Sequence, residues 1–525
     1  MKIKVIVADK ISERGFALLR ETGWDILAPA PAALPSEIAN ADGLIVRSAT
    51  KVTAQLLEAA QRLRVVGRAG VGVDNIDVEA ATHRGVLVMN TPGGNSVSVA
   101  EHTFALMLAL ARSVPQSNAS IHAGRWEKSS ASGTELRGKT LGLIGFGRVG
   151  TEVARRARAL EMDVVAHDPY VTPAAARELE VELVPLDDLL RRSDFVSLHT
   201  SLSPSTEKMI GAATLAKMKR GARLINCARG ELIDQDALRE AMASGKVAGA
   251  ALDVFEKEPP AADDPLLAME NFVATPHIGG STEEAQETVG VRIAEQIVEY
   301  LQNGAALHAV NLPALTPEQY KALAPYSKLA ERLGTFATYI SQGNPQTVRI
   351  TYFGKIAEYN THLLRNAGLA GVLQRSMAGK ANSINAMQIA GDRGLTVAER
   401  HDKRATHTDS IRLELETDAG VTSVEGAVVL DGPRLLQVNG IACEAALEGS
   451  LTYLQNEDVP GVIGYIGAAL GKSGINIATF SLGRRSAGAE AVSVIQTDQP
   501  VPDPVIAELL KNPAVKLARP VKLAT

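Results

Sequence analysis

Three side chains of the sequence have the types and settings that acid–base chemistry on a small acid requires. His277 lies in a Thr-Pro-His-Ile-Gly-Gly segment, where a proline and two glycines fix the backbone of a loop. Histidine titrates near neutral pH and can take or give a proton. Glu258 can hydrogen-bond that imidazole and hold its orientation, and Arg229 carries a planar fork that suits a carboxylate. These residues predict proton transfer on an arginine-bound acid.

Each of the three also has a plainer interpretation. A single histidine is more often structural than catalytic, Glu258 lies in a charged loop where a solvated acid is ordinary, and Arg229 can be a surface arginine before a helix. Proton transfer becomes the stronger interpretation if the chain also binds a cofactor that carries hydride.

A dinucleotide site is predicted by the glycine pattern of residues 145–150, Gly-Phe-Gly-Arg-Val-Gly. A strand-like run at 140–144 precedes it and a helix-like run at 148–160 follows. The first glycine permits the tight turn, the second lets a pyrophosphate approach bare backbone, and the third lets helix and strand pack closely. The expected ligands here are the backbone positions of Gly145, Gly147 and Gly150.

The choice between the two nicotinamide dinucleotides rests on Asp168. It follows the apolar run 162–167, close to the distance of about 20 residues at which an acid reads the adenosine ribose. A carboxylate there accepts hydrogen bonds from two free hydroxyls and repels a 2′-phosphate. The sequence therefore predicts NAD as the cofactor.

The elements before the fingerprint alternate short β-branched runs with amphipathic runs, which predicts a parallel sheet. Gly70-Val71-Gly72 follows one of these strands but lacks a third glycine in register, so it is not a second fingerprint. The predicted strands are 4–8, 43–47, 65–68 and 86–89, with helices at 12–21 and 53–60.

After the fingerprint the alternation continues and predicts a doubly wound α/β unit. Its further strands are expected at 195–198, 223–226, 249–252 and 272–274. A long helix at 282–302 follows, from which the chain can return to the first unit. The segment 309–313 resembles a boundary, because asparagine and proline stop a helix.

The carboxy-terminal third changes character. A helix at 317–340 and a strand at 347–353 precede mixed segments without a catalytic constellation. The tail is clearer and predicts a βαββαβ unit, a small split βαβ sandwich. Its elements are expected at 450–454, 460–471, 475–482, 490–497, 503–511 and 515–520.

Composition excludes several classes of protein. The 525 residues need several domains, the apolar share is 46%, and a net charge of −5 gives no electrostatic case for nucleic acid or an anionic membrane. The apolar stretch 104–111 is too short to span a bilayer and predicts a buried helix. Cys227 and Cys443 cannot supply a usual metal ligand set, so no metal is expected. With so few cysteines and no apolar signal core at its start, the chain is expected to be cytoplasmic.

Four motifs carry a family resemblance. The fingerprint, Asn-Cys-Ala-Arg-Gly-Glu-Leu-Ile-Asp at 226–234, Asp253-Val254-Phe255 followed by Glu258-Pro259, and Thr-Pro-His-Ile-Gly-Gly-Ser-Thr at 275–282 resemble the D-2-hydroxyacid dehydrogenase family over residues 1–308. Within it, the segments 46–50 and 67–75 resemble the D-3-phosphoglycerate dehydrogenases. The remaining chain resembles their long form, with an intervening allosteric substrate-binding domain and a carboxy-terminal ACT domain.

The resemblance implies an α/β architecture of four domains. A flavodoxin-like, discontinuous substrate domain would join a Rossmann-like NAD domain, an α+β intervening domain and the βαββαβ ACT domain. The implied bounds are 1–98 and 284–308 for substrate binding, 99–283 for NAD, 309–450 for the intervening domain and 451–525 for the ACT domain.

The resemblance also implies a reaction, the NAD-dependent oxidation of 3-phospho-D-glycerate in serine biosynthesis. Arg229 would hold the carboxylate and C2 oxygen, His277 would take the hydroxyl proton, and Glu258 would stabilise the imidazolium. Arg47 and Arg68 are the candidates for the phosphate, with strand-end surface charges as their alternative, and Arg125 or Lys128 of a neighbouring subunit can join them. Ser48, Gly70 and Gly72 complete the implied substrate residues. The further NAD residues are Val71, Arg148, Val149, Thr200, Cys227, Ala228, Asp253, Gly279 and Gly280.

An amino-acid effector, L-serine, is implied for paired ACT domains, with Asn456, Asp458 and Asn476 as the matching polar positions. Helix capping is the alternative function of these residues. Paired ACT domains and a phosphate contact from a neighbour favour a homo-oligomer, expected to be a tetramer. Two other functions remain open: a glyoxylate or hydroxypyruvate reductase of the same family, and a non-enzymatic NADH-sensing regulatory protein.

Overall fold

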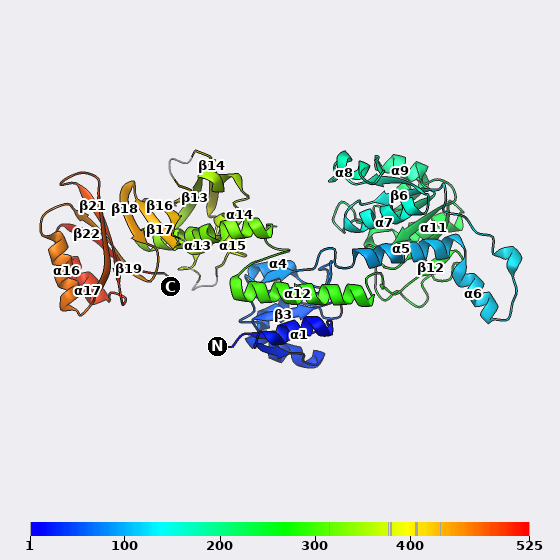
Figure 1. Ribbon diagram of the computed structural model, residues 1–525, viewed down its shortest axis with the longest axis horizontal. Coiled ribbons are helices and arrows are strands. Elements are labelled where there is room, and N and C mark those ends of the chain that lie inside the picture. The colour runs from blue at the N-terminus through cyan, green and yellow to red at the C-terminus, as the bar shows by residue number, and fades with distance from the viewer. Residues whose placement is uncertain are drawn as a thin grey trace.

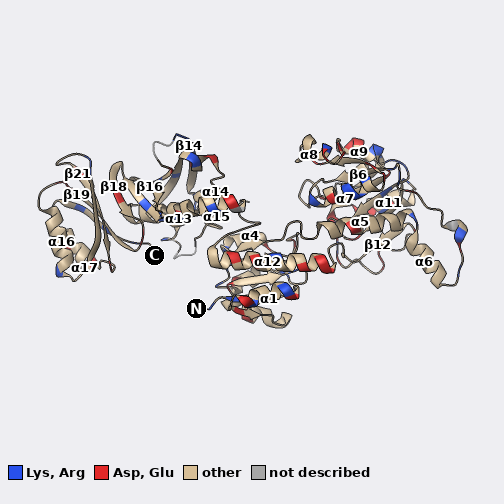
Figure 2. Cartoon of the chain, in the orientation of Figure 1, with Lys and Arg blue, Asp and Glu red and all other residues tan. Residues whose placement is uncertain are grey.

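The computed structural model describes residues 2–313, 315–375, 377, 381–404, 408–430 and 432–523. Within these residues the strands form four sheets along an elongated molecule (Figure 1). The amino-terminal sheet lies near the middle, the glycine fingerprint lies in the part at the right, and the two carboxy-terminal sheets lie at the left. Acidic and basic residues are distributed over all of these parts (Figure 2).

The amino-terminal sheet has five parallel strands in the order β2-β1-β3-β4-β5, which is the flavodoxin-like order. Its core strands are buried on both faces, as a parallel sheet covered by helices requires. The strands are β1 (Lys4–Val7), β2 (Asp25–Leu27), β3 (Gly43–Val46), β4 (Val65–Arg68) and β5 (Leu87–Met89). The helices are α1 (Glu13–Glu21), α2 (Leu34–Glu37), α3 (Ala54–Ala59) and α4 (Val78–His83).

Helix α12 (Glu283–Asn303) brings the chain back to this sheet after the seven-stranded one. It packs against α1, and the two helices approach closely at Gly15 and Gly290. A methyl group on Gly15 would lie 2.5 Å from the Gly290 carbonyl oxygen. Gly67 of β4 makes room for the same helix, because a methyl group there would lie 2.7 Å from Cγ1 of Ile293. The α12 helix therefore covers one face of the amino-terminal sheet.

The second sheet has seven parallel strands in the order β12-β11-β10-β9-β6-β7-β8. This is the doubly wound order of dinucleotide-binding folds, extended by one strand. The strands are β6 (Thr140–Ile144), β7 (Asp163–His167), β8 (Glu182–Leu183), β9 (Phe195–Leu198), β10 (Ala222–Asn226), β11 (Val247–Leu252) and β12 (Phe272–Ala274). The helices are α5 (Ser96–Ala111), α6 (Val114–His122), α7 (Arg148–Ala159), α8 (Pro173–Arg177), α9 (Leu186–Arg192), α10 (Ala212–Lys217) and α11 (Gln235–Ala243).

The apolar stretch expected as a buried helix is the second half of α5. Phe104, Met107 and Leu110 of this helix lie in the core of the seven-stranded sheet. In the described part of the chain no single helix is long and apolar enough to cross a membrane. Only α5 and α6 taken together pass that test of length and composition, and they are bent by 65° against each other.

The third sheet was mostly missed by the sequence analysis, which expected only its helix and first strand. It has six strands in the order β14-β13-β15-β16-β17-β18. Strand β15 alternates buried Ile411 and Leu413 with charged Arg412 and Glu414, which is the period of a half-buried strand. The strands are β13 (Pro345–Phe353), β14 (Thr396–Asp402), β15 (Ser410–Thr417), β16 (Gly420–Val429), β17 (Gly432–Val438) and β18 (Ile441–Ala446). The helices are α13 (Pro317–Ile340), α14 (His362–Leu373) and α15 (Ala386–Asp392).

The fourth sheet confirms the predicted βαββαβ order, with strands arranged β20-β21-β19-β22. One face carries the two helices, and the other shares a hydrophobic core with the third sheet. The rings of Phe336 and Tyr453 meet edge to face across this contact, with centroids 6.0 Å apart. The elements are β19 (Ser450–Glu457), α16 (Val462–Lys472), β20 (Ile477–Arg484), β21 (Glu490–Thr497), α17 (Asp503–Leu509) and β22 (Val515–Lys522). The two carboxy-terminal units are therefore packed as one body.

The segment 309–313, expected as a boundary, is fixed to the amino-terminal sheet. Asn311 Oδ1 accepts a hydrogen bond from Val88 N at 2.9 Å, and its Nδ2 donates to Val86 O at 2.9 Å. Asn382, which precedes α15, donates to Gly85 O at 2.8 Å. The same α4–β5 turn therefore anchors both the connecting segment and the third sheet's helical layer.

Candidate active site

The glycine fingerprint forms a turn whose three glycines serve three different purposes. Gly145 has a φ of 96°, and a methyl group on it would lie 2.6 Å from the His199 backbone. Gly150 packs against the turn itself, since a methyl group there would lie 2.4 Å from Gly145 O. Gly147 caps the 12-residue helix α7 and has open space around its Cα. The helix start is thus bare backbone, as a pyrophosphate requires.

Asp168 follows β7 and lies against this turn. Its Oδ2 accepts a hydrogen bond from Phe146 N at 2.8 Å, and its Oδ1 accepts one from Tyr170 N at 2.9 Å. Each carboxylate oxygen has further acceptor capacity, so two ribose hydroxyls can still be bound. The residues present therefore fit a dinucleotide without a 2′-phosphate.

The other predicted cofactor residues surround the same strand ends. The Thr200 backbone N would lie 2.8 Å from a methyl group on Gly145, and Val149 packs against the sheet core. The Arg148 side chain leaves α7 toward Gly93, which lies before α5. Val71, after β4, is half-exposed.

Cys227 and Ala228 follow β10, where Asn226 Oδ1 accepts a hydrogen bond from Ala228 N at 2.9 Å. Burial raises the pKa of the Cys227 thiol to about 12. Cys227 is therefore a neutral thiol at ordinary pH, and it packs against the core of the seven-stranded sheet.

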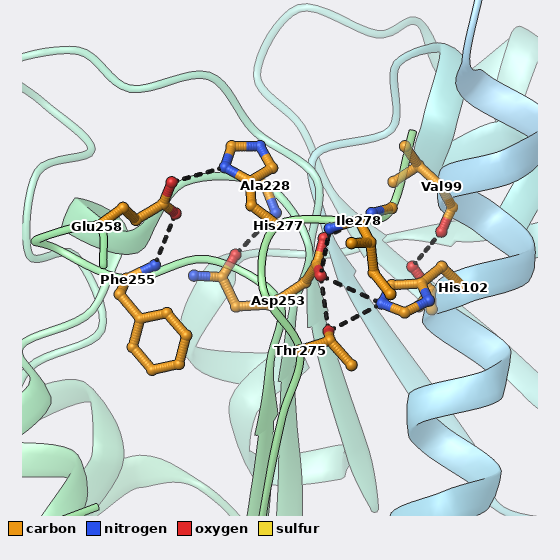
Figure 3. A network of polar contacts seen from close by, with 12 residues as sticks. Val99, His102, Ala228, Asp253, Phe255, Glu258, Thr275, His277 and Ile278 are labelled. Carbon is orange, nitrogen blue, oxygen red and sulfur yellow. Dashed lines mark hydrogen bonds and ion pairs between the residues drawn. The ribbon is translucent and has the colours of Figure 1, made fainter. Parts of the chain in front are cut away.

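His277 and Glu258 form a hydrogen-bonded pair (Figure 3). The His277 Nδ1 lies 2.8 Å from Glu258 Oε2, and Glu258 Oε1 accepts a hydrogen bond from Phe255 N at 3.1 Å. The imidazole is half-exposed, and Nε2 has no hydrogen-bond partner within the described ranges. Because Nδ1 is held by the carboxylate, Nε2 is the nitrogen that is available to exchange a proton.

The His277 backbone has a φ of 55°, which is uncommon for a residue with a side chain. Asp253 stabilises this loop, as its carbonyl oxygen accepts a hydrogen bond from His277 N at 2.8 Å. Its carboxylate accepts a hydrogen bond from Ile278 N at 2.9 Å (Figure 3). It accepts another from Gly279 N at 2.8 Å. Asp253, predicted as a cofactor residue, is thus engaged in shaping the histidine loop.

His102 of α5 and Thr275 complete this network. Thr275 Oγ1 donates to Asp253 Oδ1 at 2.6 Å, and His102 Nε2 lies 3.2 Å from the same oxygen (Figure 3). Burial raises the pKa of Asp253, but hydrogen bonds from His102 and Thr275 and from two backbone amides outweigh it and lower the pKa. His102 was not predicted from the sequence, because only the fold brings α5 beside the β12 loop. Gly280, the last residue of the predicted loop, would collide with Asn95 if it had a side chain.

Arg229 follows β10 and extends to Asp74 in the loop after β4; the region between these two strand ends is here called the cleft. Its Nη1 donates to Ala228 O at 2.7 Å, and its Nε donates to Asp74 Oδ2 at 3.1 Å. Its Nη2 lies 2.8 Å from the same carboxylate oxygen. Gly72 gives this pair its space, because a methyl group on Gly72 would lie 2.0 Å from Nη2 of Arg229. Gly230, next in the chain, packs on the Phe255 backbone, which joins the Arg229 and Glu258 loops.

Arg68 lies beside this ion pair. Burial lowers the pKa of Arg68, and the charges of Arg229 and Arg47 lower it further. Its guanidinium lies over Gly70, where a methyl group would be 1.8 Å from Nη1. The Nε atom of Arg68 is buried without a hydrogen-bond partner in the described residues. Asp74 and Asp9 oppose these charges in part, and the three arginines leave a region of positive charge that suits an anion.

Arg47 is held through its backbone by two residues that the sequence analysis did not select. Asp9 Oδ2 accepts hydrogen bonds from Arg47 N at 2.6 Å and Thr50 N at 3.1 Å. Asn75 Nδ2 donates to Arg47 O at 2.7 Å. The Arg47 side chain itself meets only Lys10 O, at 3.3 Å, among the described residues, and Ser48 is exposed beside it. The arginine therefore projects from a rigid loop with its charge available.

Arg125 and Lys128 are not brought to this cleft within one chain. They follow α6, which lies on the side of the seven-stranded sheet away from the amino-terminal sheet (Figure 1). Arg125 Nε pairs with Glu127 at 3.0 Å. A groove of about 260 Å³ on this arm is lined by Ile121, Trp126 and Lys128, among others, and the indole is 82% exposed.

The predicted effector residues are divided between two ends of the fourth sheet. Asn456 and Asp458 lie at the end of β19, where Asp458 Oδ2 accepts hydrogen bonds from Arg484 at 2.8 Å and Gly488 N at 3.1 Å. Asn476 precedes β20, where it donates to Asp498 at 2.8 Å. Since β21 pairs Ala491 with Asn456 but Thr497 with Ile477, these ends are a strand length apart. The Asn456 Oδ1 is buried without a partner in the described chain.

No group of three or more His, Cys, Asp or Glu that could hold a metal ion occurs in the described segments. Both cysteines are free thiols.

Two family models match the chain. Residues 104–279 match the NAD binding domain of D-isomer specific 2-hydroxyacid dehydrogenases, and residues 322–439 match the D-3-phosphoglycerate dehydrogenase intervening domain. The first of these confirms NAD as the cofactor class, and the second falls on the sheet in which the sequence pattern indicated no ligand residues.

Similar proteins extend over almost the whole chain. The D-3-phosphoglycerate dehydrogenase of Methanocaldococcus jannaschii is 42% identical over 517 residues, with 98% of each chain covered. The enzyme of the same name from Bacillus subtilis is 39% identical over 515 residues, again with 98% of each chain covered. Among solved structures, the TT0316 protein from Thermus thermophilus has a TM-score of 0.55 and 37% identity, covering 59% of this chain and 100% of its own. On this similarity, and on the strand orders and the glycine turn described above, the chain belongs to the D-3-phosphoglycerate dehydrogenase family of D-2-hydroxyacid dehydrogenases.

Proposed function

We propose that this chain catalyses the NAD-dependent oxidation of 3-phospho-D-glycerate to 3-phosphohydroxypyruvate, the first step of phosphorylated L-serine biosynthesis. The observation that carries the proposal is the His277–Glu258 pair at 2.8 Å, on a loop joined to that of Arg229, which in turn lies beside Arg68. A proton acceptor and a cluster of cations at one cleft match a hydroxy acid that also carries a phosphate. The proposed domain bounds are those expected from the sequence.

The proton path follows from the pairing of His277. Its Nε2 accepts the C2 hydroxyl proton, and the positive charge that the ring gains lies beside the Glu258 carboxylate, which stabilises it. NAD, when bound at the glycine turn, supplies the hydride acceptor. Reduction in the opposite direction starts from His277 in its protonated form. Arg229 holds the substrate carboxylate and so fixes C2 relative to His277.

The phosphate is assigned to Arg47 and Arg68, whereas the backbone amides of residues 70–72 assist Arg229 in binding the carboxylate. Arg47 is presented by a loop that Asp9 and Asn75 hold, and Arg68 has a buried Nε without a partner in the described residues. Guanidinium groups bind phosphate through charge-assisted hydrogen bonds. Arg125 or Lys128 from a partner copy completes this site in the proposed assembly.

Arg47→Ala is expected to raise the KM for 3-phosphoglycerate by about 10- to 100-fold, the equivalent of one lost charge-assisted bond. The KM for D-glycerate, which lacks the phosphate, should change by less than about threefold. Steady-state kinetics with both substrates test this. Arg14→Ala, which changes an exposed side chain of α1, is the matched control. An equal rise in both KM values would contradict the phosphate assignment.

A glyoxylate or hydroxypyruvate reductase is not favoured, because the relatives that cover 98% of the chain are named D-3-phosphoglycerate dehydrogenase. By comparison, a glyoxylate reductase from Paecilomyes thermophila covers 61% of this chain at 31% identity. Reduction of NAD by 3-phosphoglycerate, followed by the absorbance of NADH, tests the proposed activity directly. An NADH-sensing protein would bind the dinucleotide without turnover.

The assembly proposed is a homotetramer in the cytoplasm. The exposed Trp126, Val114 and Ile121 on the α6 arm supply one apolar pairing surface, and the fourth sheet supplies another at its edge strand β20. The first pairing would carry Arg125 and Lys128 of one copy toward another. Two different self-pairing surfaces give a dimer of dimers.

L-serine is proposed as the effector of the fourth sheet. Asp458 and Asn476 lie at opposite ends of that sheet in one chain, so one small ligand can touch both only between two copies. The Asp458 carboxylate suits the ammonium group, and an asparagine suits the carboxylate.

Asp458→Ala should raise the serine concentration for half-inhibition at least about tenfold without changing kcat, because it removes the ion pair to the ammonium group. The inhibition curve of wild type and variant measures this. The control is Asp503→Ala, which changes a residue of helix α17 in the same βαββαβ unit. Inhibition that survives both Asp458→Ala and Asn476→Ala would tell against this site.

A further inference from the structure

The guanidinium of Arg229 is already engaged by the protein on one edge. Asp74 Oδ2 accepts a hydrogen bond from Nε at 3.1 Å and lies 2.8 Å from Nη2. Ala228 O accepts a hydrogen bond from Nη1 at 2.7 Å. An arginine has five N–H donors in a fixed plane. Three are used, which leaves one N–H on each terminal nitrogen. Those two form the end-on fork that binds a carboxylate bidentately.

Asp74 is placed for this contact by the loop after β4. The chain passes Gly72, whose missing side chain leaves room for both groups, since a methyl group there would lie 2.0 Å from Arg229 Nη2 and 2.7 Å from Asp74 Oδ2. The ion pair joins the carboxyl end of β4 in one sheet to that of β10 in the other. It is therefore a contact across the cleft, and both partners remain partly exposed, at 29% for Arg229 and 63% for Asp74.

Positive side chains outnumber negative ones around the Arg229–Asp74 pair. Asp74 interacts with Arg229 and Arg68, and Arg68 with Arg47. Burial raises the pKa of Asp74, but the charge of Arg229 and the hydrogen bond from it outweigh this effect and lower the pKa. The carboxylate is thus ionised at neutral pH and reduces the net positive charge that an incoming acid meets.

We infer that Asp74 is a positioning residue for the reaction: it holds the Arg229 guanidinium by its side edge, so that the end-on fork faces the substrate carboxylate in one orientation. This inference rests on the proposed function, in which Arg229 binds that carboxylate. Asp74 itself does not touch the substrate. Its negative charge weakens the binding of acids, while its hydrogen bonds fix their orientation relative to His277.

The two effects have opposite signs when Asp74 is replaced. Asp74→Asn removes a negative charge next to Arg229, so a simple carboxylate should bind more tightly. The same change releases the guanidinium plane, so bound substrate samples more orientations and hydride transfer slows. A loss of folded protein or a distorted loop cannot tighten one ligand while it slows turnover.

The experiment compares wild-type, Asp74→Asn and Asp77→Ala enzymes with NAD and 3-phosphoglycerate, with oxalate as the carboxylate probe. For Asp74→Asn we expect kcat to fall at least about tenfold and the inhibition constant of oxalate to fall about threefold or more. Asp77 caps α4 through Ala80 N at 2.9 Å and has no contact with Arg229, so Asp77→Ala controls for structural damage nearby. Its kcat and oxalate inhibition should match wild type.

Weaker oxalate binding together with a lower kcat, or no change in either value, would overturn the inference. If Asp74→Asn does not fold, a crystal structure of the wild-type enzyme with NADH and oxalate replaces it. Asp74 should then still accept the hydrogen bond from Arg229 Nε while the end-on fork of Arg229 binds oxalate. Loss of the Asp74 contact would overturn the positioning role of Asp74. Full activity of Arg229→Ala would instead refute the proposed function, which separates the two failures.

Discussion

His277→Asn is expected to lower kcat for 3-phosphoglycerate oxidation by about 10³- to 10⁴-fold, the upper range for the loss of a general base. Asparagine is the informative replacement because the residue has a φ of 55°, which asparagine tolerates better than most other side chains. The backbone of the loop, held by Asp253, should therefore persist while the proton acceptor is lost. Steady-state kinetics at saturating NAD provide the measurement.

Two controls accompany this variant. Its NAD affinity should be within about twofold of wild type, because the glycine turn and Asp168 are untouched. His362→Asn changes an exposed histidine of α14 and should leave kcat unchanged. A kcat for His277→Asn within about tenfold of wild type would remove His277 from the mechanism.

Arg229→Lys should lower kcat/KM by about 10³-fold, or about 4 kcal/mol of transition-state stabilisation. A lysine keeps the charge but has no planar fork, so it cannot engage Asp74, Ala228 O and a bidentate carboxylate at once. The conservative substitution therefore tests the geometry of the guanidinium separately from its charge.

Progress curves over a range of 3-phosphoglycerate concentrations give the value for Arg229→Lys. Arg239→Lys is the matched control, since Arg239 lies on α11 with only a 3.7 Å contact to Asp236. If Arg229→Lys retained more than about a tenth of the wild-type kcat/KM, the carboxylate would have to be held by another group.

Local features were predictable where the pattern of neighbouring residues specifies them. Strands β6, β9 and β12 have the predicted bounds. The glycine turn was predictable because the tight turn, the close helix packing and the bare backbone are all specified by glycines within one short segment. The loop that presents His277 was equally visible, since a proline and two glycines flank it. The third sheet was missed because its strands mix glycine and charged residues, although β15 alternates clearly.

The sequence by itself determined the glycine turn, the place of Asp168 beside it, the histidine loop and the βαββαβ order of the fourth sheet, because each is set by residues close together in the chain. Only the tertiary structure decided that Asp74 meets Arg229, that His102 supports Asp253, and that Asp458 and Asn476 lie apart. These relations depend on which strand ends become neighbours after a crossover and on how two sheets face each other. Hydrophobic periodicity reports which face of an element is buried, but it does not identify the distant residue that will lie against it.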